Sequence, residues 1–367
     1  MTTVSEAAVL SGGVSAAASA AVKKSNGYIV GALYDNIFFI TAPISAFAIG
    51  LLVYFSHLPS MRIRIFSHEG SPDTIFLGSF IMAHLFIVFF RSNGNKKIFE
   101  TYPYRFTVVP LTLFCAMCFS KWVAISASVL ATWWDVYHSS LQTFGLGRIY
   151  DARAGNDANV GRRLDYLVNL LIYAGPIFAG VVLMSHTKDF QEYDAVKAVL
   201  FSHLGDTIDT KQSYLRYTVL AFGVPFIIYY LYSYWRYHQQ GYTISPQKVV
   251  LLSSTAAVSI FTWGFDSFGQ AFFIMNFFHA FQYFGIVWWS EKKSMMGLFK
   301  LQNVKWGKWA TLALFLGIGF GYGVWAEVSD GGTVSSGLDL GWNATIVVSL
   351  MHFWYDGFIW SVRKSQV

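Results

Sequence analysis

Ten long apolar runs, separated by polar segments, constrain the fold of this chain more than any other feature. Each run is long enough for a helix to cross a bilayer, which takes about 17–25 residues. The runs are 28–55, 74–91, 103–120, 122–145, 164–185, 214–236, 247–265, 268–289, 307–327 and 338–361. They predict an all-α, polytopic integral membrane protein, built as a single bundle of about ten transmembrane helices.

The charged residues of the chain agree with a membrane protein. Asp, Glu, Lys and Arg make up 13% of the residues, whereas a soluble domain holds about 25%. The net charge of +6 would suggest nucleic acid in a soluble protein. Here Lys and Arg gather in loops and form no organised basic patch, so we expect no nucleic-acid partner.

Loop charge also predicts the orientation of the bundle. The loops at 91–105 and 146–163 and the loop after residue 289 are rich in Lys and Arg, whereas 328–337 has neither. Basic loops stay on the cytoplasmic side, so we expect both termini to be cytoplasmic and the membrane to be a bacterial inner (plasma) membrane. Residues 1–27 are expected to form a disordered tail, and 28–367 a single transmembrane domain.

One polar stripe interrupts the fourth apolar run. In WWDVYHSSLQTFG, residues 133–145, Asp135, His138 and Gln142 are spaced i, i+3, i+7 and so share one helical face. Polar groups are costly in lipid and normally face a bundle interior. The stripe therefore predicts an inward-facing site.

Four histidines lie within predicted spans, on four different helices. They are His84, His138, His279 and His352. All four spans run from outside to inside by the loop-charge rule, and each histidine falls at the middle or in the cytoplasmic half. Similar depth on four helices predicts that the imidazoles meet.

Carboxylates and amides accompany these histidines at helical spacing. Asp356 follows His352 by four residues, and Asp135 precedes His138 by three. Imidazole with carboxylate suits iron, manganese or zinc, and a cation offsets the cost of a buried carboxylate. We therefore predict metal ligation by His84, His138, His279, His352, Asp135 and Asp356. Polar neighbours that orient the ligands and fix imidazole tautomers are predicted at Gln142, Gln282, Asn276, Asp35 and Tyr283.

The metal is expected to be non-haem iron, as one or two ions, because the predicted ligands include no thiolate of the kind that structural zinc prefers. Its partners would be membrane lipids, an apolar small-molecule substrate and an electron donor. The predicted function is a membrane oxidoreductase that acts on a lipid, an isoprenoid or a hydrocarbon. The sequence alone does not single out catalytic residues.

Other interpretations of the same residues stay open. Single histidines on separate spans also ligate haem, in a haem-binding or quinol-linked electron carrier. Chains of Asp and His also build proton-coupled transporters. Polar side chains can simply hydrogen-bond between helices, as in an accessory subunit of a larger complex. The clustered histidine boxes of membrane desaturases are absent, because no two histidines are closer than eleven residues.

Overall fold

The computed structural model describes residues 27–65, 68–180, 212–265, 268–330 and 339–360. Within these ranges the chain is helical apart from short connections and one antiparallel hairpin, β1 with β2. The elements in chain order are α2 (Ala32–Asp35), η1 (Asn36–Ile40), α3 (Ala42–Tyr54), η2 (Leu58–Ser60), β1 (Ile63–Ile65), β2 (His68–Gly70), α4 (Pro72–Phe86), α5 (Val88–Ser92), α6 (Lys96–Thr101), α7 (Pro103–Phe119), α8 (Lys121–Arg153), α9 (Arg162–Gly180), α13 (Gln212–Gln239), α14 (Pro246–Phe265), α15 (Phe268–Leu298), α16 (Gly307–Asp330) and α17 (Leu340–Ile359).

The helical character predicted from the sequence is confirmed, and the described part of each of the ten apolar runs overlaps one to three helical elements. Among the described residues, four helices are long and apolar enough to cross a membrane, and a bent pair makes up to five. They are Pro72–Ser92, Tyr214–Gln239, Pro246–Phe265, Gly307–Val328 and the pair Ala32–Ile40 with Ala42–Tyr54. The helices α8, α9, α15 and α17 carry polar residues among their apolar ones, and α7 has 17 residues.

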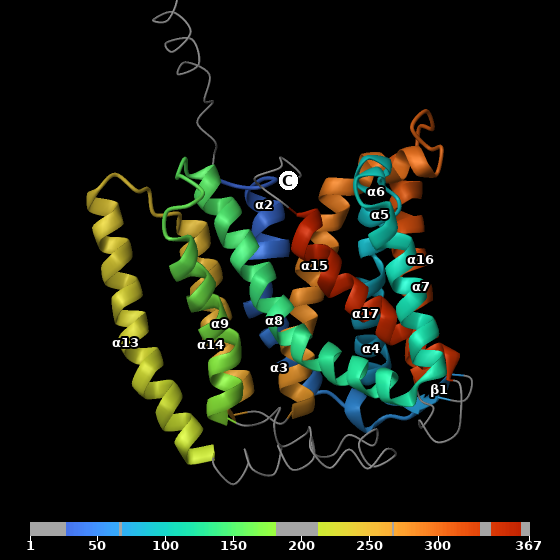
Figure 1. Cartoon of the computed structure of the whole chain (residues 1–367), viewed down its shortest axis with the longest axis horizontal. Helices are drawn as coiled ribbons and strands as arrows, with labels where there is room; N and C mark the ends of the chain where they lie inside the picture. Colours follow the sequence, from blue (N-terminus) through green and yellow to red (C-terminus); the bar gives the residue numbers. More distant parts are fainter. Residues whose placement is uncertain (1–26, 66–67, 181–211, 266–267, 331–338, 361–367) are drawn as a thin grey trace, which may run out of the picture.

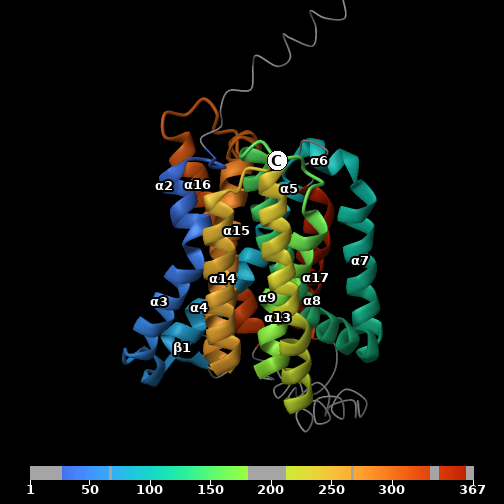
Figure 2. The same ribbon diagram turned by 90° about the vertical axis from the view of Figure 1, so that its left-hand side faces the viewer.

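The helices stand roughly side by side, with α13 at one edge of the bundle and α7 and α16 at the other, except that the first part of α8 crosses the lower part of the bundle (Figure 1). Figure 2 shows the bundle from the α13 side, with α3 and α7 at opposite edges. The start of α2 and the end of α17 lie at the same end of the bundle (Figure 1). The predicted tail, apart from Gly27, lies outside the described residues.

Close packing of α4 against α16 depends on glycine. A Cβ added to Gly323 would overlap the Ser79 carbonyl oxygen, and a Cβ added to Gly78 would overlap the Glu327 carboxylate. Small residues let membrane helices approach closely. This contact fixes α4, which carries His84, against the rest of the bundle.

The first long helix is broken rather than continuous. The π-helical turn η1 separates α2 from α3, and the two halves are bent by 58°. Breaking the ladder frees backbone groups, which need partners inside a membrane. Gln282 Nε2 donates to the Phe39 carbonyl at 2.9 Å, and the Tyr34 hydroxyl donates to the Gly285 carbonyl at 2.8 Å. Both bonds attach the break to α15, the helix that carries His279.

Candidate metal centre

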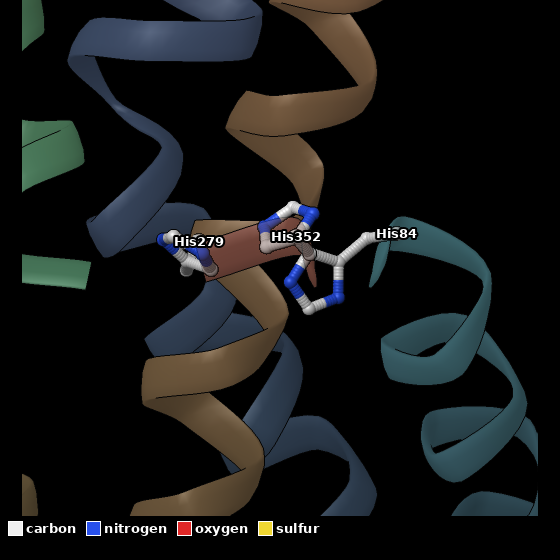
Figure 3. Close-up of side chains that lie close together, drawn as sticks. All are labelled: His84, His279 and His352. Atoms are coloured by element: carbon white, nitrogen blue, oxygen red, sulfur yellow. The ribbon is translucent and has the colours of Figure 1, made fainter. Parts of the chain in front are cut away.

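Four helices bring the four predicted histidines together. His84 comes from α4, His138 from α8, His279 from α15 and His352 from α17. Neighbouring ring centroids are 5.2 Å apart for His84–His279, 5.0 Å for His279–His138, 4.7 Å for His138–His352 and 5.0 Å for His352–His84. The four imidazoles therefore form a closed ring, the four-histidine cluster. Figure 3 shows His84, His279 and His352 converging from three of the helices.

The cluster is sealed inside the bundle. His84, His279 and His352 are 0% exposed and His138 is 4% exposed. His84 Nδ1 lies 2.5 Å from the Ile81 carbonyl oxygen. A carbonyl can only accept, so Nδ1 carries the proton and Nε2 keeps its lone pair.

Several ring nitrogens have no hydrogen-bond partner within the described part of the chain. They are His84 Nε2, His279 Nδ1 and Nε2, and His352 Nδ1. Buried polar atoms without a partner cost about 1–3 kcal/mol each. A neutral imidazole has one lone pair and one N–H. A bound cation would therefore satisfy one nitrogen of His279 and the lone pairs of His84 and His352, which is the first sign that these residues fit a metal.

Asp356 is the carboxylate that joins the cluster. Its Oδ2 lies 3.7 Å from His138 Nε2 and 3.9 Å from His352 Nε2. Its Oδ1 accepts hydrogen bonds from the Tyr283 hydroxyl at 2.8 Å and from Trp360 Nε1 at 2.9 Å. One oxygen is thus anchored and the other faces the imidazoles; that Tyr283 orients a metal ligand stays a prediction.

Two sets of potential ligand atoms can be distinguished in this region. His84, His279 and His352 form one set, and His138, His352 and Asp356 form the other. Within each set the donor atoms lie within 4.8 Å of one another. Three imidazoles are a common zinc ligand set, and two imidazoles with one carboxylate are typical of non-haem iron. Metal ligation by these residues stays a prediction.

Asp135 and Asp35 lie apart from both ligand sets. Asp135 is half-buried on α8 and belongs to neither set. Asp35 accepts from the backbone N–H groups of Ile29 at 2.6 Å and Val30 at 2.9 Å, and from the Tyr150 hydroxyl at 3.1 Å. Asp35 therefore holds the chain at the start of α2 instead of orienting a histidine.

The predicted amides bind backbone and each other. Gln142 Nε2 donates to the His279 carbonyl and to Gln282 Oε1, both at 3.0 Å. Gln282 Nε2 in turn donates to the Phe39 carbonyl. No described bond from either glutamine reaches an imidazole nitrogen, so the expected role in fixing tautomers is not what these bonds do. They position α8, α15 and the helix break. Asn276 is buried on α15.

A second polar cluster, which the sequence shows only in part, lies where α8, α9 and α14 meet. Arg148 and Asp151, three residues apart on α8, pair at 2.7 Å. The cluster also includes Asp165, 2.6 Å from Arg148, and Lys248, which reaches Asp151 at 2.7 Å and Asp165 at 2.8 Å. We call these four residues the ionic cluster. The sequence signal for this cluster was a charged residue at the start of each of two apolar runs, Asp165 in 164–185 and Lys248 in 247–265.

The end of α17 is held by a further ion pair. The Arg91 guanidinium pairs with Glu291, lies 3.8 Å over the Trp360 ring and donates to the Ile359 carbonyl. Trp360 in turn donates to Asp356. The ion pair thus supports the residue that anchors the carboxylate of the candidate centre.

Comparison of the chain with protein-family models, with curated proteins and with solved structures gives no match. The assignment of a function therefore rests on the geometry of the centre itself.

Proposed function

We propose that this protein is an integral membrane oxidoreductase with a non-haem iron centre, which oxidises an apolar, membrane-soluble substrate. The proposal includes ten membrane spans, cytoplasmic termini, a bacterial inner membrane and a separate electron donor. Four or five described helices are long and apolar enough to cross a membrane. The proposal counts the helices around the centre, which carry polar residues, as further spans.

One observation carries the proposal. Four helices, far apart in sequence, place four buried imidazoles in a closed ring, and several of their nitrogens lack partners among the residues that the structure describes. Interhelical hydrogen bonding alone would be expected to pair these atoms with donors or acceptors. A metal ion held by His84, His279 and His352 would account for the convergence and for most of the missing partners together.

The residues of the chain would divide the work. His138, His352 and Asp356 supply the two-imidazole, one-carboxylate set, with His84 and His279 beside it. An iron ion held there would supply redox chemistry with O2. Tyr283 and Trp360 hold the carboxylate in place. The closed bundle excludes water from the reacting groups.

The electron-carrier alternative is weaker on steric grounds. Neighbouring imidazoles at ring-centroid distances of 4.7–5.2 Å leave no gap for a porphyrin plane among them. A proton-coupled transporter or an accessory subunit would also need these polar groups, but neither calls for ring nitrogens without hydrogen-bond partners.

The test is the metal content and the visible spectrum of the purified protein. The proposal expects iron at one or two equivalents and no Soret band. The variant His279→Ala should lose most of the iron, whereas the control His57→Ala, at an exposed position, should keep it. A Soret band would favour the haem alternative, and a preparation free of transition metals that resists loading with iron would refute the proposal.

A further inference from the structure

A cavity of about 520 Å³ opens between α7, α8 and α17. Its walls include Trp122, Ser126, Leu130 and Trp134 of α8 and Met351 and Trp354 of α17. No charged side chain lines it, and Ser126 contributes the single hydroxyl among its lining residues. We call it the α7–α8–α17 groove.

The groove has an open mouth and a closed floor. Trp122 is 59% exposed and Leu130 50% exposed at the mouth, whereas Ala127 and Met351 at the floor are 6% and 4% exposed. The mouth faces away from the bundle. For a helix bundle in a membrane, the surrounding medium on that side is hydrocarbon.

The groove runs along α8 toward the four-histidine cluster. Trp122, Ser126, Leu130 and Trp134 follow one another at four-residue intervals, and His138 is the next residue in that series. From Trp122 to Trp134 the helix rises about 18 Å. One leaflet of a bilayer contributes about half of its hydrocarbon core of about 30 Å. The groove is therefore about as long as one acyl chain.

Two aromatic rings separate the groove from the cluster. The Phe353 ring lies 6.5 Å from the Trp134 ring and 5.0 Å from the His138 ring. A chain that fills the groove would thus end at these rings, one helical turn from the candidate ligand His138.

We propose that the α7–α8–α17 groove binds a single acyl chain of a membrane lipid, which enters laterally from the bilayer and ends at the Trp134 and Phe353 rings, one helical turn from His138. That the bound acyl chain is also the substrate rests on the proposed function. That the groove binds an acyl chain does not depend on that function. The volume lies within the roughly 300–1,000 Å³ of single-ligand pockets. Because no charged group lines the walls, a lipid head group stays outside.

The expected preference is modest. Lipid tails are as apolar as the groove, so transfer from bilayer to groove gains no hydrophobic free energy. The preference comes from dispersion contacts with the tryptophan faces and from shape. We expect enrichment of about fivefold over an ordinary lipid-facing surface, which corresponds to roughly 1 kcal/mol.

The experiment uses the full chain in phosphatidylcholine nanodiscs that contain a palmitoyl chain with a diazirine. After irradiation, labelled peptides are mapped by mass spectrometry. The variants Leu130→Trp and Ser126→Phe fill the groove from exposed positions. The control Leu220→Trp adds the same bulk on α13, where Leu220 is 51% exposed. Metal content is measured on every preparation.

We expect labelling around Trp134 and Met351 to exceed that on α13 by about fivefold, to fall severalfold in both groove variants and to persist in Leu220→Trp. Equal labelling at the groove and on α13, or labelling that both groove variants leave unchanged, overturns the site; a groove covered by a second copy of the chain would give that result. Enriched labelling without metal refutes the proposed function and leaves the acyl-chain site standing. Bound metal without enriched labelling of the groove refutes the acyl-chain site and leaves the proposed function standing.

Discussion

Two carboxylates follow or precede a histidine by one helical turn, but only one of them reaches the four-histidine cluster. Asp356 faces His138 and His352, whereas Asp135 lies outside both ligand sets. The sequence places both acids near a histidine on their own helix. It does not give the rotation of α8 against its neighbours, which decides the direction in which Asp135 points.

The two acids therefore provide a matched pair of substitutions. Asp356→Asn keeps an oxygen that accepts from Tyr283 and Trp360 but removes the charge beside the imidazoles. We expect metal affinity to fall about 10–100-fold, measured by competition with a chelator. Asp135→Asn should change it less than twofold. Equal losses in the two variants would contradict the assignment.

A similar limit applies to the glutamines. Their spacing with His138 and His279 predicts polar company for the cluster, and both do lie between helices. Sequence could not reveal that the break between α2 and α3 leaves the Phe39 carbonyl in need of a donor, which Gln282 supplies. The convergence of the histidines, in contrast, was predictable from their similar depth on four helices together with the cost of turning an imidazole toward lipid, which favours an inward direction for each.

At the scale of helices, Gly323 is one of the two glycines that permit the contact between α4 and α16. In Gly323→Ala the new Cβ meets the Ser79 carbonyl, so α4 must move. We expect destabilisation of about 1–3 kcal/mol, as for other overpacking substitutions, and a lower metal content because His84 moves with α4. Gly321→Ala, two residues away in open space, should be neutral or slightly stabilising. Thermal unfolding in detergent measures both, and equal midpoints would contradict the packing argument.

The ionic cluster joins α8, α9 and α14, and Lys248 is its central cation. Lys248→Met would leave Arg148 as the one cation that pairs with both Asp151 and Asp165 among the described residues. Removing one partner of a buried pair costs about 3–5 kcal/mol, so the unfolding midpoint should fall sharply. The control Lys96→Met removes an exposed partner of Glu100 and should shift stability by less than about 0.5 kcal/mol. A small effect of Lys248→Met would show that the cluster contributes little to stability.

At the scale of the whole molecule, the side of each loop follows from the span count. Arg153 and Lys305 belong to the basic loops, while Ser60 lies at the other end of a span. Single cysteines at these exposed positions, in a chain with Cys115 and Cys118 replaced by serine, can be labelled in inverted and right-side-out vesicles. We expect positions 153 and 305 to react on the cytoplasmic side and position 60 on the opposite side. Reaction of positions 153 and 305 on opposite sides would refute the ten-span topology.

The central claim is that imidazoles from four helices hold a metal ion, and X-ray absorption at the metal edge tests it most directly. We predict a first shell of nitrogen and oxygen at about 2.0–2.2 Å, outer-shell scattering typical of imidazole, and fewer imidazoles around the metal that His279→Ala retains. A shell of sulfur, or a spectrum that His279→Ala leaves unchanged, would contradict the claim.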